Sequence, residues 1–511
     1  MTSRILGVVR EQVLAAYFGA GNAMDAFNVA FRIPNLVRDL FAEGAMSSAF
    51  VPTFTRQLTS QGKPAAWRLA NLVINALIVI TGCLVIVGIV FAGPLVELFA
   101  SAYREVPGKI ELTVFLTRLM LPFLTLVALA AAVMGMLNSL HRFFIPALSP
   151  AMFNVATIVC AVVLVPLMPD LGLPAIAAIA IGTVIGGVAQ LAVQWPVLRR
   201  EGFHYQPVLN WRDEGLRRVL VLMGPGTIGL AATQVNVFVN TVLATGEGTG
   251  AVSWLNFAFR LMYLPIGLFG VSIATATLPA VSRHAAQGDE PAARRTIADG
   301  LSLMLMLNVP ATVGLIVLAT PIVRVIFERA AFTPADTAAT AAAVRFYALG
   351  LAGYSIVRII SPVFYALGQN RTPVKVSIAT VLVNALLNIA LVRVLGYVGL
   401  ALGTSIAALF NATLLMFFLG RRLDGIEGAR VAGSLVRIVI ASVAMGAAAV
   451  GVDRAATGLM PGTSLLLQIS RLSLTITAAV GILAAAAYVL RIREFHEGMT
   501  LVTRRLRIRG R

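Results

Sequence analysis

The chain has 511 residues, 59% of them hydrophobic and 12% charged, with a mean hydropathy of +0.88 and a formal net charge of +18. Soluble domains carry about 25% charged residues, so this composition excludes an ordinary soluble enzyme. Cys83 and Cys160 both lie inside apolar runs and the four histidines are scattered, which argues against a disulfide framework and a zinc site.

The first two predicted helices carry charges at membrane depth. In residues 1–20, Arg4 is close to the start, whereas Arg10 and Glu11 lie deeper. A glycine-containing turn leads to a second helix over 25–56, whose charged residues are Asp25, Arg32, Arg38, Asp39 and Glu43. An ionisable group in hydrocarbon is costly unless it faces protein or water. The segment therefore predicts a helix lining a wet cavity, and the alternative is a soluble helix with a solvated charged face.

Long apolar runs follow to the end of the chain. They are 69–100, 112–137, 151–168, 173–198, 301–323, 376–395, 398–419, 431–451 and 473–490. Each is close to the ~20 residues that a spanning helix needs. More polar helices are expected at 219–244, 251–283 and 336–368. We predict an all-α polytopic membrane protein with about 14 transmembrane helices, because the runs do not alternate as barrel strands must.

A polar connection over 199–218 divides the chain, and we expect it to include an interfacial segment anchored by Trp211. The predicted organisation has five parts. They are an N-terminal six-helix lobe at 1–200, a cytoplasmic linker at 201–218, a C-terminal six-helix lobe at 219–422, two extra helices in 423–495 and a basic tail at 496–511.

An internal repeat relates the two lobes. LNFAFRLMYLPIGLFG at 255–270 matches FNVAFRIPNLVRDLFA at 27–42 without a gap, and the shared pattern includes an N-x-A-F-R core. The matched segments fall on the second predicted helix of each lobe. Six spans separate them, so the two repeats are expected to be parallel, about an axis normal to the membrane.

The positive charge is distributed unevenly between the connections. Basic residues gather in alternate connections, at 56–68, 141–142, 199–218, 283–295, 371–375 and 421–430, and in the tail. The intervening connections at 19–24, 168–173 and 244–250 are weakly charged, and those at 100–111 and 324–336 mix both signs. This alternation predicts cytoplasmic termini and argues against nucleic acid as the partner. We expect the basic tail to contact anionic lipid headgroups.

Arginines from both lobes form the main candidate site. Arg10, Arg38 and Arg260, with Arg4 and Arg32 nearby, lie in predicted membrane helices that contain few acidic residues. If the arginines exceed their acidic partners, the cavity would attract an anion, and guanidinium binds phosphate through two hydrogen bonds. The alternative is that they only make structural ion pairs between helices.

A second polar set comes from three other predicted helices and consists of Asn240, Asn384, Asn388 and Thr404. Their oxygens suit a hard cation, but the set has no carboxylate, so interhelical hydrogen bonding is the favoured interpretation. The chain has no Walker A, G-x-S-x-G or H-E-x-x-H motif, and no paired carboxylates for glycosyl chemistry. We therefore expect a transporter, not an enzyme.

Several motifs resemble the MurJ/MviN lipid II flippase family, part of the multidrug/oligosaccharidyl-lipid/polysaccharide exporter superfamily. They are SRILGVVRE near the start, PNLVRDLFAEGA at 34–45, HRFFIPALSP at 141–150, AVSW with FRLMYLP at 251–265, and RTPVK at 371–375. The resemblance covers essentially the whole chain. It implies two six-helix lobes around a central cavity and two C-terminal helices that form a groove for a lipid tail.

The resemblance also implies a substrate and residue roles. The substrate is lipid II, the undecaprenyl-pyrophosphate-linked peptidoglycan precursor, which the family moves to the outer leaflet of the bacterial inner membrane by alternating access. The residues implied for substrate binding are Arg4, Arg10, Asn35, Arg38 and Arg260, and those implied for gating are Ser3, Asp25 and Glu43. Some members bind Na⁺ at positions that resemble Asn240, Asn384, Asn388 and Thr404. Here two usual carboxylates are asparagines, so no cofactor is expected, and Na⁺ is the alternative.

Other functions would explain part of the same sequence features. The alternatives to a lipid II flippase are a flippase for another polyprenyl-linked saccharide, a drug exporter, or a scaffold for cell-wall synthesis proteins that does not transport. A cation exporter should line its cavity with carboxylates, whereas this one is rich in arginine. A polyprenyl-phosphate transferase would need an acidic metal-binding motif, which the sequence does not show.

Overall fold

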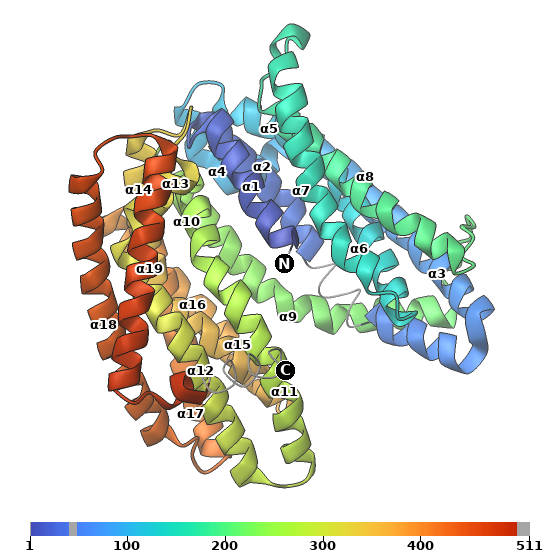
Figure 1. Ribbon diagram of the computed structural model, residues 1–511. Coiled ribbons are helices and arrows are strands. Elements are labelled where there is room, and N and C mark those ends of the chain that lie inside the picture. The colour runs from blue at the N-terminus through green and yellow to red at the C-terminus, as the bar shows by residue number, and fades with distance from the viewer. Residues whose placement is uncertain (1, 40–48, 498–511) are drawn as a thin grey trace, which may run out of the picture. The chain divides into compact units, whose positions relative to one another are not determined.

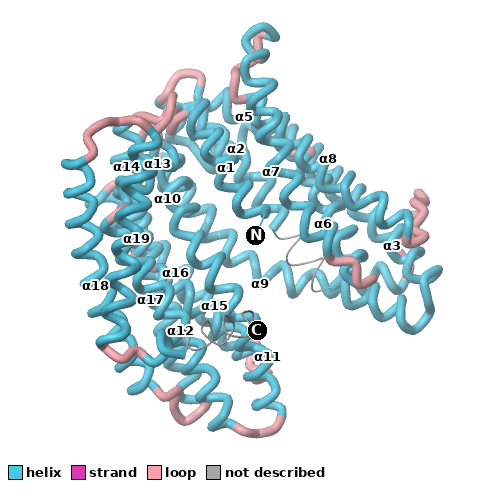
Figure 2. Tube along the Cα trace, in the orientation of Figure 1, coloured by secondary structure: helices cyan, strands magenta, loops and turns pink. Residues whose placement is uncertain are grey.

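The structure is a computed structural model that describes residues 2–39 and 49–497. Within these two ranges the chain consists of helices joined by short connections, and no strand occurs there (Figure 2). The prediction of an all-α protein is therefore confirmed. Figure 1 labels the helices in chain order.

The chain divides into two compact units, which are residues 1–253 with 329–332, and residues 254–328 with 333–511. The helices of the first unit are α1 (Thr2–Phe18), α2 (Asn22–Asp39), α3 (Val51–Val90), α4 (Ala92–Ala100), α5 (Lys109–Met120), α6 (Phe123–Ser139), α7 (Phe144–Leu164), α8 (Ala177–Arg200) and α9 (Glu214–Thr245). Three short 3₁₀ turns, at Ser101–Glu105, Val165–Leu167 and Pro169–Leu171, interrupt the connections.

The second unit contains most of α10 (Ala251–Pro265) and all later elements. They are a π-helical turn at Ile266–Gly270, α11 (Val271–Ala286), α12 (Glu290–Val317), α13 (Ala319–Phe327), α14 (Pro334–Ala348), α15 (Leu351–Ala366), α16 (Arg371–Leu395), α17 (Tyr397–Arg422), α18 (Gly428–Leu459) and α19 (Leu465–Val489). Helix α9, which the sequence assigns to the second lobe, groups with the first unit. The units are defined by packing, whereas the predicted lobes at 1–200 and 219–422 are defined by the internal repeat. The lobes therefore stay a prediction.

Nine described helices are long and apolar enough to cross a membrane, and the bent pair α14–α15 would make a tenth. Helix α1 has 17 residues, and α2 carries two arginines and two aspartates. Neither helix has the length and composition of a simple lipid-facing span. The described helices therefore establish a protein with many membrane spans, while the expected total of about 14 stays a prediction.

Several predicted spans are broken, and proline accounts for two of the breaks. The span expected at 112–138 is divided into α5 and α6 next to Pro122, and the span expected at 251–283 changes to a π-helical turn directly after Pro265. Proline has no N–H to donate and its ring clashes with the preceding turn, so the helix must adjust there. Helix α3 is kinked at Gly62, whose φ of 81° a residue with a side chain rarely adopts.

The connection after α8 is fastened to α3, and its expected location at the membrane interface stays a prediction. Residues 203–210 form no helix, and they lie along α3, where two asparagines one turn apart bind their backbone. The Asn71 side chain donates to His204 O at 3.0 Å and accepts from Gln206 N at 2.9 Å. The aromatic rings of Trp67 and Phe203 pack edge to face beside these bonds, with centroids 5.4 Å apart. The connection is thus an extended strap fastened to a long helix.

The two extra helices are integral to the second unit. Helix α18 packs against α12 and α19, and α19 also contacts α13. Gly446 of α18 has no space for a side chain, because an added Cβ would lie 2.6 Å from Val313 Cγ1 of α12. Close approach through small residues is typical of helices that pack inside a membrane.

Candidate substrate-binding and gating site

Asp25, near the start of α2, is completely buried with 0% of its surface exposed. Its carboxylate accepts four hydrogen bonds. Oδ2 accepts from Lys109 Nζ at 3.0 Å and from the Gly250 N–H at 2.7 Å. Oδ1 accepts from the Ser253 hydroxyl at 2.7 Å and from the Ser253 N–H at 3.1 Å. Since Ser253 belongs to the first turn of α10, Asp25 caps the start of that helix, where the macrodipole favours negative charge.

Asp25 and Ser253 hold equivalent positions in the internal repeat, because the alignment pairs residue 27 with 255 and therefore 25 with 253. The two equivalent residues thus bond directly to each other. The Ser253 hydroxyl also accepts from Asn28 Nδ2 at 3.1 Å. One copy of the motif carries an acid and the other a hydroxyl, so the contact joins a donor to an acceptor and not two like groups.

Further contacts lie beside this cluster. Asn22 Oδ1 accepts from the Thr249 hydroxyl at 2.8 Å, and the Ala331 N–H donates to Ala16 O at 3.1 Å. At Gly19 an added Cβ would lie 2.4 Å from the Ala331 oxygen, so only glycine fits there. These residues, with Lys109, lie in or beside connections that the charge pattern assigns to one side of the membrane. We call the set of Asn22, Asp25, Lys109, Thr249, Gly250 and Ser253 the Asp25 cluster.

Lys109, at the start of α5, is a residue that the sequence analysis missed. Its side chain is 2% exposed, and its Nζ lies 4.0 Å from the centroid of the Tyr103 ring. The charged partner of Asp25 in the described part of the chain is this lysine. A cation in a connection of mixed charge gave no signal in the sequence, because only folding shows that it is buried.

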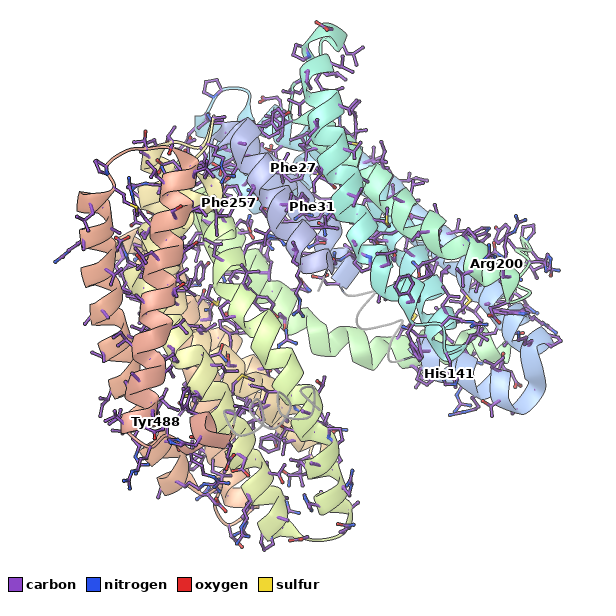
Figure 3. All side chains as sticks on the ribbon, viewed as in Figure 1. Phe27, Phe31, His141, Arg200, Phe257 and Tyr488 are labelled. Atoms are coloured by element: carbon purple, nitrogen blue, oxygen red, sulfur yellow. The ribbon has the colours of Figure 1, made fainter. Side chains whose placement is uncertain are left out.

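Arg10 of α1 is buried together with its neighbour in sequence, Glu11. The two side chains form an ion pair with Nη2 and Oε1 2.5 Å apart, and they are 10% and 8% exposed. The guanidinium also lies 5.3 Å from the centroid of the Phe153 ring on α7. Phe31 of α2 stacks near the same ring, with centroids 6.4 Å apart, and on Phe27 at 5.9 Å (Figure 3). An aromatic cluster therefore positions Arg10 between α1, α2 and α7.

Arg38, at the end of α2, likewise pairs with an adjacent acid. Its Nε and Nη2 donate to the same oxygen of Asp39, at 3.0 and 2.5 Å, and Gln234 Nε2 donates to the other oxygen at 3.4 Å. Asn35 lies one turn earlier, and its Oδ1 is buried without a hydrogen-bond partner among the described residues. The structure thus shows Arg10 and Arg38 each beside the carboxylate of the next residue in the same helix, whereas the alternative raised by the sequence concerned ion pairs between helices.

The remaining predicted residues are less closely held. Arg4 is exposed on α1, and the Ser3 carbonyl accepts from Asn154 Nδ2 at 3.0 Å. Arg260 is exposed on α10 and belongs to the second unit. The expectation that it meets Arg10 and Arg38 around one cavity therefore stays a prediction. Glu43 lies outside the described residues.

Arg358 is a second residue that the sequence analysis missed. It is exposed on α15, donates a hydrogen bond to the Tyr263 hydroxyl and lies 5.8 Å from the centroid of that ring. Tyr263 is one turn after Arg260 on α10. A single arginine inside the apolar run 351–366 was the available signal, since such residues are rarely left facing lipid.

The candidate cation residues are only partly brought together. Asn384 and Asn388 of α16 are 2% and 0% exposed, and Asn388 Nδ2 donates to Asn384 Oδ1 at 2.9 Å. The Thr404 hydroxyl of α17 donates to Leu400 O at 2.7 Å, and Asn240 belongs to the other unit. The printed hydrogen bonds of Asn388 and Thr404 lie within their own helices, and the set contains no carboxylate. A sodium site at these residues stays a prediction.

Comparison with protein families decides the assignment. The family model described as "Lipid II flippase MurJ" matches residues 14–470. The chain belongs to the MurJ lipid II flippase family. It is therefore a bacterial membrane protein with several spans, as the resemblance implied.

Relatives and solved structures agree with this assignment. A probable lipid II flippase MurJ of Vibrio cholerae is 33% identical over 500 residues, which cover 96% of this chain and 92% of the relative. The lipid II flippase MurJ of Burkholderia cenocepacia is 36% identical over 430 residues, 83% of this chain and 82% of the relative. A solved structure of lipid II flippase MurJ in an inward closed conformation matches with a TM-score of 0.78 and 26% identity over 96% of this chain and 97% of that chain.

A more distant likeness concerns the fold alone. An inward-facing multidrug transporter of the MATE family matches with a TM-score of 0.70 and 14% identity, over 83% of this chain and 96% of that one. This likeness shows a related fold over most of the chain.

Proposed function

We propose that the chain moves lipid II from the cytoplasmic to the outer leaflet of the bacterial inner membrane by alternating access, and so supplies precursor for cell-wall synthesis and cell shape. The observation that carries this proposal is the family match over residues 14–470. Both relatives compared above bear the name of lipid II flippase. The protein performs no covalent chemistry in this proposal.

The pyrophosphate of the substrate binds to Arg10, Arg38 and Arg260, with Arg4 and Asn35 beside them. A planar guanidinium matches two phosphate oxygens and binds them through a pair of charge-assisted hydrogen bonds. In the described structure Glu11 and Asp39 hold two of these arginines. A diphosphate carries more charge than one carboxylate, so it exchanges with these acids on binding, and their return helps release on the other side.

Gating rests on the Asp25 cluster, with Ser3 and Glu43 as further gating residues. Its bonds fasten the start of α10 next to α2 and α5, so access from that side requires their release. Charges that move across the membrane during this change respond to the membrane potential, which supplies about 2.3 kcal/mol per charge per 100 mV.

The remaining parts serve the lipid. Helices α18 and α19 hold the polyprenyl tail, and the basic residues after 490 contact anionic headgroups on the cytoplasmic side. Both chain termini are cytoplasmic in this arrangement, because the basic connections then follow the positive-inside rule. No step of this proposal is assigned to a bound ion.

The decisive experiment is complementation of a bacterium depleted of its lipid II flippase, combined with an assay of lipid II translocation. We expect the wild-type chain to restore both growth and translocation. Arg260→Ala should abolish translocation, and Arg260→Lys should also be impaired because an ammonium lacks the two-pronged geometry.

Normal translocation by Arg260→Ala would exclude the charged-cavity mechanism. Growth restored by variants that fail to translocate would instead support a scaffold for cell-wall proteins. Restored transport of a different polyprenyl-linked saccharide in place of lipid II would change the substrate and leave the transporter class intact.

A further inference from the structure

We propose that Lys109 is a positioning residue of the gate, which holds the Asp25 carboxylate in place against the first turn of α10. Its role in transport rests on the proposed function, whereas its role in holding Asp25 can be tested without any substrate. No other lysine side chain is so fully buried within the described residues.

The first argument is the burial of the ion pair. The Asp25 side chain is 0% exposed and the Lys109 side chain 2%, and Nζ and Oδ2 are 3.0 Å apart. Two charges removed from water this completely are tolerated only when each compensates the other and the remaining lone pairs and protons are bonded. Lys109 is the cation that meets this requirement for Asp25.

The second argument is that the two oxygens of the Asp25 carboxylate have different hydrogen-bond donors. Oδ1 accepts only from Ser253, through its hydroxyl and its N–H, while Oδ2 accepts from both Lys109 and Gly250. The three bonds from residues 250–253 are those that hold the start of α10. The bond from Lys109 comes from another helix, so it fixes the carboxylate independently of α10.

The third argument is that Lys109 is itself held. Its Nζ lies 4.0 Å from the centroid of the Tyr103 ring, and Tyr103 is 1% exposed. A cation over an aromatic face is stabilised by the ring quadrupole, most strongly where water is excluded. The lysine therefore has a fixed position in the absence of Asp25's other partners, as a positioning residue requires.

The test uses the full chain in membranes with a cross-linking reporter of the closed cluster. Cys83 and Cys160 are replaced by Ser, and Asn22→Cys is combined with Thr249→Cys, because these side chains contact each other at 2.8 Å. We expect Lys109→Gln to slow oxidative cross-linking by about tenfold or more, since it leaves a buried carboxylate uncompensated. Asp25→Asn should slow it similarly, and the double variant should be no slower than either single variant.

Arg104→Gln is the matched control. Arg104 is a nearby cation in the same connection, but its side chain is 64% exposed and pairs with Glu97. Its loss should leave cross-linking unchanged. Wild-type cross-linking in Lys109→Gln, or an equal fall in Arg104→Gln, would overturn the proposal.

The proposal can also be tested if the Lys109→Gln variant fails to fold. If Lys109→Gln does not accumulate, the double variant Lys109→Gln/Asp25→Asn should accumulate, because both buried charges are then removed together. Failure of the double variant to recover would show that the lysine does not act through Asp25. Cross-linking needs neither lipid II nor transport, so this result is independent of the complementation experiment.

Discussion

At the scale of single residues, two of the candidate arginines form ion pairs with the acid that follows them in the sequence. Arg10 and Glu11 are adjacent in sequence, as are Arg38 and Asp39, and each pair forms its own ion contact. In each pair the carboxylate compensates the charge of the guanidinium within the same helix. Asn388 also bonds close by in the sequence, since its side-chain amide donates to Asn384 one turn earlier on the same helix.

Gly403 provides a prediction at this scale. A Cβ added there would lie 2.0 Å from Asn388 Oδ1, so Gly403→Ala must displace the buried amide or separate α17 from α16. We expect a loss of about 1–3 kcal/mol in the free energy of unfolding, as for other overpacked sites. Thermal or denaturant unfolding in detergent measures it.

The control for this variant is Gly433→Ala on α18, where an added Cβ meets nothing within 4 Å. That change should be neutral or stabilise by up to about 1 kcal/mol, since alanine favours helix. Equal stability of the two variants would contradict the packing argument.

At the scale of elements, two predicted spans break next to proline and one helix is kinked at a glycine with positive φ, while polar side chains fasten a long connection. The strap after α8 is the clearest case. Asn75 of α3 donates to Gln206 O at 2.7 Å and Val208 O at 3.0 Å, and accepts from the Tyr205 hydroxyl at 2.7 Å. A side chain thus supplies the backbone bonds that a helix or sheet would otherwise provide.

Asn75→Ala should release this strap. The loss of three hydrogen bonds at a buried site is expected to cost about 1–3 kcal/mol and to make the strap more sensitive to limited proteolysis. Thr59→Ala on the same helix is the control, because the exposed Thr59 hydroxyl bonds only its own helix, at Thr55 O. Unchanged cleavage of the Asn75 variant would show that the strap is held by other contacts.

Glu201 gives a prediction about pH. Hydrogen bonds from Arg142 and Lys63 lower the pKa of this carboxyl below its ordinary value of 4.5. Because the folded pKa is depressed, the stabilisation is complete above the ordinary value and is lost as pH falls through the folded one. The contact joins the end of α8 to α3 and to the connection after α6.

The unfolding temperature of the wild-type chain should therefore fall more steeply below about pH 4.5 than that of Glu201→Gln. The control is Glu111→Gln, since Glu111 is exposed and makes no ion pair within the described contacts. If Glu201→Gln and the wild type lose stability in parallel, the contact with Arg142 and Lys63 does not contribute.

At the scale of the whole molecule, the arrangement in the membrane follows from alternation of charge along the chain. The connection before α12 is in a basic region, and the one before α19 is weakly charged. We expect Gln287→Cys to react with an impermeant maleimide only after the cytoplasmic membrane is opened, and Ser464→Cys to react in intact spheroplasts. Both residues are exposed, and both native cysteines are first replaced. The reverse pattern would invert the proposed orientation.

The sequence by itself determined the class of the protein, the positions of most helices, the internal repeat and the family. These properties depend on local quantities, such as the length of apolar runs, the placement of proline and the residues of a motif. It also identified Asp25, Arg10 and Arg38 as embedded charges, since each lies in an apolar segment.

Only the tertiary structure decided the hydrogen-bond and ion-pair partners of Asp25 and of the strap. Lys109 pairs with Asp25 across 84 positions, and Ser253 does so across 228 positions. The strap bound by Asn71 and Asn75 was equally absent from local patterns. Which cation becomes buried beside which acid depends on helix packing between distant segments, and no spacing along the chain encodes it.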